Sequence, residues 1–318
     1  LDYSTGAEAF LLEPQSTNLI TYSEDFSQWV RNSGTTITTN SAISPDGTQN
    51  ASLIVAAGTG SRTGLDVSIV SGTTYTLSVY LKNNGGNTSI TIGSHTTSQL
   101  ETITINDEWN RYTTTFVASS TTTSSIRIIS SGSNINLYSW GAQLEQQSYP
   151  TSYIPTSGAT ATRNQELCNN ATPVINSEEG TLYAEISALA EGTGTYREFG
   201  LSDGTSSKRV LISYINSDNV VRANFDGMAG ATTLLHTLTN ATDFVKIAVV
   251  YKPNRFELWV NGIKVNQDVS GSTFPAGILT ELNFNSGSTG SPFFGNTKGL
   301  KYYPKALADV QLEDLTTI

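Results

Sequence analysis

The side chains best suited to binding a ligand are aromatic rings that lie close in sequence to amides and a guanidinium group. In residues 74–81 apolar and polar side chains alternate, so Tyr80 falls on the opposite face of the expected strand from Leu77 and Leu81. An aromatic ring offers a flat apolar surface that stacks on a sugar ring, while amides and hydroxyls supply directional hydrogen bonds. The candidate ligand-binding residues are therefore Tyr80, Tyr112, Arg62, Asn83 and Asn84.

The aromatic residues also have a structural interpretation. The tryptophans alternate with apolar neighbours or open a strand, which favours core packing for Trp29, Trp109, Trp140 and Trp259. For Tyr80 the alternative to ligand binding is packing beneath a neighbouring loop or a second sheet. Both interpretations stay open at the level of the sequence.

Carboxylates in the expected loops are candidates for holding a structural calcium ion. Ca²⁺ prefers hard oxygen ligands, which loop carboxylates and backbone carbonyls provide. Glu24, Asp25 and Asp46 in the first half could meet Glu145 at the end of the last strand of that half. None of these residues belongs to a recognisable calcium-loop motif, so solvated turn acids are the alternative.

The residues that most often carry catalysis do not form a known pattern. Neither His95 nor His236 lies beside a G-x-S-x-G motif, which would place a nucleophilic serine on a sharp turn. Glycoside hydrolysis needs two carboxylates at a fixed separation, but the adjacent pairs at 24–25 and 178–179 would point to opposite faces of a strand. We expect no catalytic residues, with a site assembled across strands as the alternative.

The overall composition excludes several classes of partner. The chain has 318 residues with a net charge of -10 and only 14% charged residues, which argues against nucleic-acid binding and against an anionic membrane surface. No apolar run approaches the about 18 residues of a membrane-spanning helix, so we expect no membrane insertion. The single cysteine, Cys168, excludes an internal disulfide. The chain begins at Leu1 without methionine, and we expect it to be a fragment.

Alternating strands and turn signals predict an all-β protein. Short segments with one apolar face recur every 10–12 residues in the first half, separated by turn dipeptides such as Ser71-Gly72. Between residues 140 and 163 a strand-like ending leads into Pro150 and Pro155, which interrupt strand pairing. We therefore predict two antiparallel β-sandwich (jelly-roll) domains in tandem, divided by an extended connector.

The strongest local signal in the second half is a hairpin. Residues 256–260 alternate as a strand, Asn261-Gly262 is typical of a type I′ turn, and residues 263–265 return. Residues 306–315 are the one segment expected to form a helical turn or two.

The first half resembles the jelly-roll carbohydrate-binding modules of the family 4/9 type over about 130 residues. The motifs that carry this resemblance are residues 18–20, Phe26 and Trp29, Asp46-Gly47, and segments 72–82, 109–116 and 140–145. Segments 11–20, 22–26 and 153–163 resemble phage virion and tail-fibre proteins. The second half, with its Asn-Gly hairpin, Phe294-Gly295 and the closing segment 299–307, resembles the laminin-G, concanavalin A-like lectin fold, which hosts many functions.

These resemblances imply the following organisation. Residues 1–15 form an N-terminal extension, 16–148 a carbohydrate-binding-module-like jelly roll, 149–168 a linker, and 169–318 a laminin-G-like sandwich.

The function implied is non-enzymatic recognition of cell-surface polysaccharide by a phage virion appendage. This implies a virion or extracellular location, with other virion proteins or further copies of this chain as additional partners. The alternatives are an accessory binding region of a secreted polysaccharide-degrading enzyme and a structural spacer that binds no ligand.

Overall fold

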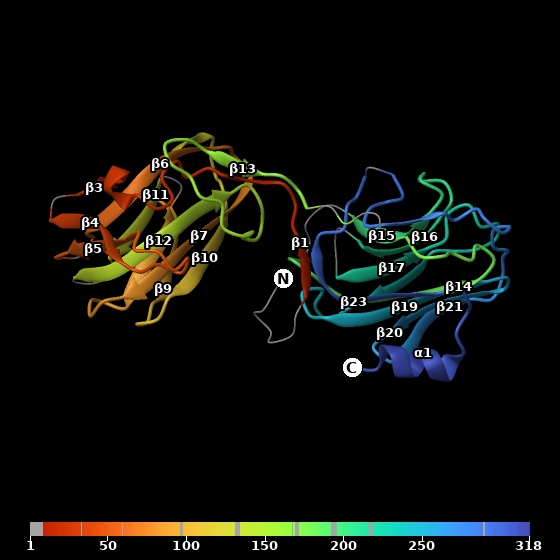
Figure 1. Cartoon of the computed structure of the whole chain (residues 1–318). Coiled ribbons are helices and arrows are strands. Elements are labelled where there is room, and N and C mark those ends of the chain that lie inside the picture. Colours follow the sequence, from red (N-terminus) through yellow and green to blue (C-terminus); the bar gives the residue numbers. More distant parts are fainter. Residues whose placement is uncertain are drawn as a thin grey trace. The chain divides into compact units, whose positions relative to one another are not determined.

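The computed structural model describes residues 9–32, 34–58, 60–95, 98–130, 134–166, 168, 172–191, 196–215, 219–288 and 290–318. Strands dominate throughout these residues and the sheets are antiparallel, which confirms the predicted all-β sandwich class. The chain divides into two compact units, each described here by itself (Figure 1). Unit 1 comprises Leu1–Pro14 and Gln165–Ile318, and unit 2 comprises Gln15–Asn164.

Unit 2 is a sandwich of two five-stranded sheets. The first has the strand order β10-β7-β12-β5-β4 and contains β4 (Thr35–Ala42), β5 (Ala51–Ala56), β7 (Thr74–Asn83), β10 (Asn110–Val117) and β12 (Ile135–Glu145). The second has the order β3-β6-β11-β8-β9 and contains β3 (Val30–Arg31), β6 (Arg62–Ile69), β8 (Ser89–Ser94), β9 (Gln99–Thr104) and β11 (Thr122–Ser130). The short 3-10 helix η1 (Phe26–Gln28) precedes β3.

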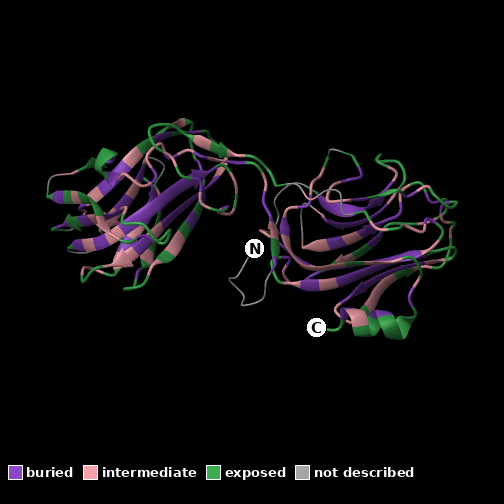
Figure 2. Cartoon of the chain, viewed as in Figure 1, coloured by how far each residue is buried: buried purple, intermediate pink, exposed green. Residues whose placement is uncertain are grey.

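The core of unit 2 follows from the alternation of its strands. In β7 the side chains of Tyr75, Leu77, Val79 and Leu81 are all buried in one apolar cluster, which is the face that the sequence pattern predicts. The facing sheet contributes Ile126 and the other inward residues of its strands to the same cluster (Figure 2). Each sheet therefore turns one face toward the core and the other face away from it.

Unit 1 is a second sandwich, with a helix on its outside. Its six-stranded sheet has the order β1-β23-β14-β19-β20-β21, with β1 (Phe10–Leu12), β14 (Gly180–Ala188), β19 (Val245–Lys252), β20 (Arg255–Val260), β21 (Ile263–Asp268) and β23 (Gly295–Tyr303). The five-stranded sheet has the order β18-β17-β16-β15-β22, with β15 (Arg197–Ser202), β16 (Arg209–Tyr214), β17 (Val220–Asn224), β18 (Leu234–Thr237) and β22 (Glu281–Asn283).

Helix α1 (Asp309–Thr316) lies within the C-terminal region where the sequence predicts a helical turn or two. Its Leu312 packs with Tyr183, Val250 and Trp259 of the six-stranded sheet. Among the described residues, no helix has the length and apolar character needed to cross a membrane.

Two segments lie differently from the predicted ranges. Residues 10–12, which fall in the predicted N-terminal extension, pair with Gly295–Thr297 as the edge strand β1 of unit 1. Residues 149–164, which fall in the predicted linker, belong to unit 2, where β13 (Ala161–Arg163) pairs with β2 (Ser16–Asn18). Strand β12 ends at Glu145, before Pro150, and backbone donors between the two prolines find partners on unit 2. The Thr151 N–H donates to Glu145 Oε2 (2.9 Å) and the Ile154 N–H donates to Gln143 Oε1 (2.7 Å).

The side chain of Asn18 fixes this closing segment. It is fully buried, and its Nδ2 donates to the carbonyls of Ala142 (3.1 Å) and Ile154 (2.9 Å). Its Oδ1 accepts from the backbone N–H groups of Ile20 (3.0 Å) and Leu144 (3.1 Å). One amide thereby joins the start of the unit, its last long strand and the segment that follows.

The predicted type I′ hairpin is present between β20 and β21. Val260 pairs with Ile263, and the two residues between them have positive φ angles, 48° at Asn261 and 85° at Gly262. A Cβ added to Gly262 would also lie 3.1 Å from the Thr317 hydroxyl.

We predict that Gly262→Val lowers the free energy of unfolding by about 1–3 kcal/mol, because a β-branched residue is strained at positive φ. Chemical denaturation of the two proteins measures this difference. Ile263→Val, at the exposed neighbouring position, keeps the turn dihedrals and is expected to change stability by less than about 0.5 kcal/mol. Equal stability of wild type and Gly262→Val would contradict the turn assignment.

Candidate ligand-binding site

Part of the outer face of the first sheet of unit 2, over β7 and its neighbour β10, is covered by the unit's own chain. Thr76 and Ser78 point away from the core of β7, yet both are fully buried. The Thr76 hydroxyl donates to the Gln147 carbonyl (2.8 Å), and Arg111 donates to Ser78 Oγ (2.9 Å) and to the Thr151 carbonyl (2.7 Å). Residues 147–154 therefore occupy the surface on which a ligand would otherwise lie.

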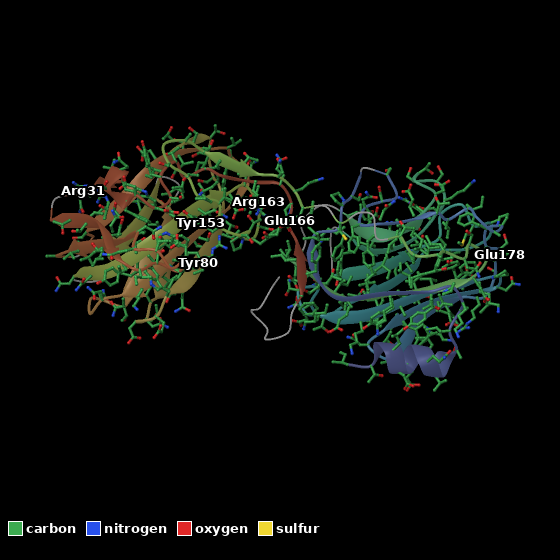
Figure 3. The ribbon with its side chains drawn as sticks, viewed as in Figure 1. Arg31, Tyr80, Tyr153, Arg163, Glu166 and Glu178 are labelled. Atoms are coloured by element: carbon green, nitrogen blue, oxygen red, sulfur yellow. The ribbon has the colours of Figure 1, made fainter. Side chains whose placement is uncertain are left out.

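The predicted ligand-binding tyrosines lie on this covered sheet. Tyr80 is half-buried, and its ring centroid lies 5.3 Å from that of Trp140. The guanidinium carbon of Arg111 lies 5.6 Å from the Tyr80 ring centroid. The ring centroid of Trp140 in turn lies 4.5 Å from that of Tyr153. Tyr80 and Tyr153 are labelled in Figure 3. Tyr112 on β10 is also half-buried and packs against the core. Both predicted tyrosines therefore pack against other side chains of unit 2: Tyr80 against Trp140 and Arg111, and Tyr112 against the core.

The predicted amides hold a turn. Asn83 Oδ1 accepts from the Gly86 N–H (3.1 Å), and Asn84 Nδ2 donates to Asn136 Oδ1 (3.0 Å). Arg62, the remaining predicted ligand-binding residue, lies on the other sheet, at the start of β6. The structure thus does not gather the five predicted residues into one site.

Two of the four predicted calcium ligands, Glu24 and Asp46, meet around Asn50. Its Nδ2 donates to Glu24 Oε2 (3.2 Å) and to Asp46 Oδ2 (3.1 Å). Glu24 and Asp25 line an open polar hollow of about 320 Å³. Hydrogen bonds from Ser44 and Thr48 lower the pKa of Asp46 to about 2, so this carboxylate is charged at neutral pH.

Glu145, the fourth predicted ligand, is fully buried. Its carboxylate accepts from Ser16 Oγ (2.6 Å), Thr151 Oγ1 (2.5 Å) and the Thr151 N–H (2.9 Å). In the described ranges no three His, Cys, Asp or Glu side chains come together as a metal site. Calcium binding stays a prediction.

The second sheet of unit 2 has an outer face with accessible polar side chains. Arg62 and Asp66 on β6, and Ser125 and Arg127 on β11, are half-buried or exposed and point away from the core. They line a hollow of about 200 Å³ that we call the arginine groove. Its lining residues are Val30, Arg31, Asn32, Arg62, Gly64, Asp66, Ser125 and Arg127.

Strand register explains why the groove is hollow. Arg127 lies directly opposite Gly64 of β6 on one side and Gly93 of β8 on the other. A Cβ added to Gly64 would lie 2.8 Å from Arg127 Cγ and 2.8 Å from the Ile126 carbonyl. The absence of a side chain at position 64 therefore leaves room for the arginine stem across the sheet.

The groove has an excess of positive charge. It contains the guanidinium groups of Arg31, Arg62 and Arg127 and the single carboxylate of Asp66, and none of the three arginines forms an ion pair with a carboxylate of the described residues. Burial and the nearby Arg62 lower the pKa of Arg127. Burial, Arg127 and Arg62 also lower the pKa of His95. Burial, which disfavours the charged form, is the main cause of both shifts, and the neighbouring cations add to it.

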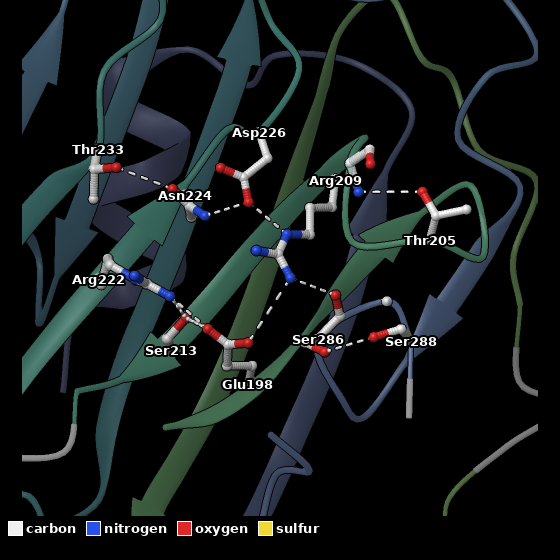
Figure 4. A network of polar contacts seen from close by, with 12 residues as sticks. Glu198, Thr205, Arg209, Ser213, Arg222, Asn224, Asp226, Thr233, Ser286 and Ser288 are labelled. Carbon is white, nitrogen blue, oxygen red and sulfur yellow. Dashed lines mark hydrogen bonds and ion pairs between the residues drawn. The ribbon is translucent and has the colours of Figure 1, made fainter. Parts of the chain in front are cut away.

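Two half-buried arginines in unit 1 have the opposite arrangement. On the outer face of its five-stranded sheet, Arg209 pairs with Asp226 and Arg222 pairs with Glu198, which also lies 4.0 Å from Arg209 (Figure 4). Two cations and two anions neutralise one another there. This network has the properties of a structural ion-pair cluster, whereas the arginine groove has one carboxylate, Asp66, beside three arginines.

Sequence reasoning identified Arg62 but not Arg31 or Arg127. The alternation of residues 125–129 places Arg127 between Ile126 and Ile128, out of phase with the apolar face, and this signal was present in the sequence. The pairing of β6 with β11, which brings Arg62 and Arg127 together, depends on strand order and has no local signal.

Comparisons with known proteins give a fold likeness. No protein-family model matches the sequence, and neither does any curated protein. A Ruminococcus gnavus IT-sialidase CBM40, bound to α2,3-sialyllactose, is 17% identical over 44% of this chain and 83% of its own, with a TM-score of 0.37. The leech intramolecular trans-sialidase in complex with 2,7-anhydro-Neu5Ac is 17% identical over 45% of this chain and 24% of its own, with a TM-score of 0.38.

Mouse laminin α1 domains LG4-5 are 10% identical over 88% of this chain and 92% of their own, with a TM-score of 0.29. A carbohydrate-binding module and laminin G domains, the two classes that the sequence resembles, thus both occur among structures similar to this chain. The ligand has to be inferred from this chain's own residues.

Tyr80 allows a direct test of the two interpretations of the aromatic cluster. We predict that Tyr80→Ala lowers the free energy of unfolding by about 1–3 kcal/mol, because Trp140 and Arg111 lose a packing partner. Thermal unfolding measures the loss. A variant with unchanged stability but weakened glycan binding would instead assign Tyr80 to the ligand site.

Proposed function

We propose that this protein is a non-enzymatic recognition protein that binds polysaccharide through the outer face of sheet β3-β6-β11-β8-β9 in unit 2. The observation that carries the proposal is the arginine groove on an accessible sheet face. Residues 147–154 occupy part of the outer face of the other sheet, over β7 and β10, which favours this face for an extended ligand.

The chemistry of the face suits a hydroxyl-rich chain. Guanidinium groups present several donors in fixed directions, and serine and threonine hydroxyls both donate and accept. The polar side chains on the outer positions of the three central strands are Arg62, Asp66, Ser68, Thr91, Thr123, Ser125 and Arg127. An open face of this kind binds by hydrogen bonds along its length and needs no deep pocket.

The wider setting is also part of the proposal. We infer from the sequence resemblance in segments 11–26 and 153–163 that the chain belongs to a phage virion appendage and meets cell-surface glycans outside the cell. A calcium ion near Glu24, Asp25 and Asp46 is proposed as a structural ion. The alternatives remain an accessory region of a polysaccharide-degrading enzyme and a ligand-free spacer, and the binding experiment below separates the spacer from the other two.

Arginine replacement in the groove tests the function. We predict that the full chain binds at least one polysaccharide of a panel of bacterial surface glycans, measured by affinity electrophoresis. Arg62→Ala combined with Arg127→Ala is expected to weaken that binding on the order of tenfold or more, because hydrogen bonds from charged donors are lost.

The control is Lys208→Ala, which removes one positive charge from an exposed position in unit 1. It is expected to bind as the wild type does. Absence of binding to the entire panel by folded wild-type protein would favour the spacer, and equal weakening by the control would remove the groove from the site.

A further inference from the structure

We propose that the arginine groove selects acidic saccharides, and that a negatively charged oxyanion on the sugar, a carboxylate or a sulfate, is held between Arg62 and Arg127. This inference rests on the proposed function, because it specifies the class of polysaccharide that the same face binds. The shared chemistry is an oxyanion that accepts hydrogen bonds from guanidinium groups.

Positive and negative charges in the arginine groove are out of balance. The groove brings together three arginines and one aspartate, in a chain whose net charge is -10. Elsewhere in the chain, Arg209 and Arg222 pair with carboxylates, as does Arg255, which contacts Glu257. Clustering three cations around a single carboxylate costs electrostatic free energy in the free protein. A bound oxyanion would recover that free energy.

The guanidinium groups of Arg62 and Arg127 have N–H donors available for a ligand. Arg127 uses its Nε to donate to Ser125 Oγ (3.0 Å), and Arg31 donates to the Ser27 carbonyl (3.4 Å). In the part of the chain that the structure describes, the side chain of Arg62 and the terminal nitrogens of Arg127 have no hydrogen-bond acceptor within bonding distance. These groups can therefore donate to a ligand without first breaking a protein contact.

The arginine groove also has room for a ligand. Gly64 stands between Val30 and Arg127 across three neighbouring strands, so no side chain fills the middle of the groove. The hollow of about 200 Å³ is smaller than the about 300–1,000 Å³ of typical small-molecule pockets. It therefore suits one charged sugar unit of a longer chain, with the rest of the polysaccharide lying along the open sheet face.

Asp66 allows a second test, in which the expected change in affinity is opposite to that of the arginine variants. It lies on the same side of β6 as Arg62 and directly opposite Ser125, and it is the only carboxylate that lines the groove among the described residues. Its negative charge opposes an incoming oxyanion. Removing that charge should therefore strengthen the binding of an acidic sugar, while removing an arginine should weaken it.

The experiment measures binding of the full chain by isothermal titration calorimetry. The probes are a galacturonic acid hexamer, its methyl ester, and a sulfated galactan oligosaccharide with its desulfated form. At 50 mM NaCl we expect the charged member of at least one pair to bind about 10–100-fold more tightly than its neutral partner, as hydrogen bonds to charged groups imply. The carboxylate and sulfate arms identify which oxyanion is recognised.

The variants are Arg62→Gln, Arg127→Gln, Asp66→Asn and the control Lys208→Gln, each first checked by thermal unfolding. Each arginine variant is expected to lose most of the preference for the charged probe. Asp66→Asn is expected to increase affinity for the charged probe about threefold or more and to leave the neutral probe unchanged. Raising NaCl to 1 M should reduce the preference, because screening shortens the range of charge interactions to about 3 Å.

The outcomes separate this inference from the proposed function. Equal binding of charged and neutral probes, reduced by the arginine variants, would overturn the inference and leave polysaccharide binding intact. Binding to none of the probes would overturn the inference in both arms. Should Arg127→Gln fail to fold, Arg62→Gln and Asp66→Asn still decide the matter, since opposite changes in affinity are required of them.

Discussion

The rest of unit 2 depends on how the chain after β12 is held against the sheet it has just left. The fully buried amide of Asn18 makes hydrogen bonds to both β12 and the closing segment. The buried carboxylate of Glu145 adds bonds to Ser16 and Thr151. Because buried polar groups must find partners, these two side chains fix the segment in one position. In that position the segment covers the outer face of the first sheet over β7 and β10, and it leaves the outer face of the second sheet accessible.

The accessible face then differs from other polar surfaces of the chain in its charge balance. In the ion pairs of Arg209 with Asp226 and of Arg222 with Glu198, each positive charge is balanced by a carboxylate of the protein itself. The arginine groove has Asp66 as its only acidic lining residue among those described, and burial together with the nearby Arg62 lowers the pKa of Arg127. A protein with an overall negative charge has no general need for such a cluster. Local recognition of an anion gives it a physical reason.

Much of the fold was predictable because alternation is a local property. The inward face of β7 and the Asn261–Gly262 turn both follow from residues within ten positions of one another. Strand β1 was not predictable, because its three residues pair with Gly295–Thr297 from the far end of the chain. The same limit applies to the site. Arg62 can be singled out in the sequence, but its neighbour Arg127 comes from a strand whose register only the folded sheet defines.

The covered position of Tyr80 has a similar cause. Alternation correctly places Tyr80 opposite the core face of β7, yet it cannot tell that residues 147–154 return over that side. A polar outer face in a strand is therefore evidence of orientation and not of solvent exposure. The aromatic ring then meets Trp140 from the neighbouring strand, so its local surroundings are set by packing within the sheet.

The most direct measurement of the central claim is an NMR titration that follows the arginine side-chain Nε–Hε resonances while an acidic oligosaccharide is added. We expect the signals of Arg62 and Arg127 to shift together and to saturate. The signals of Arg209 and Arg222, which pair with carboxylates of the protein, should stay unchanged. Saturable shifts confined to residues around Tyr80 and Trp140, with Arg62 and Arg127 unaffected, would contradict it.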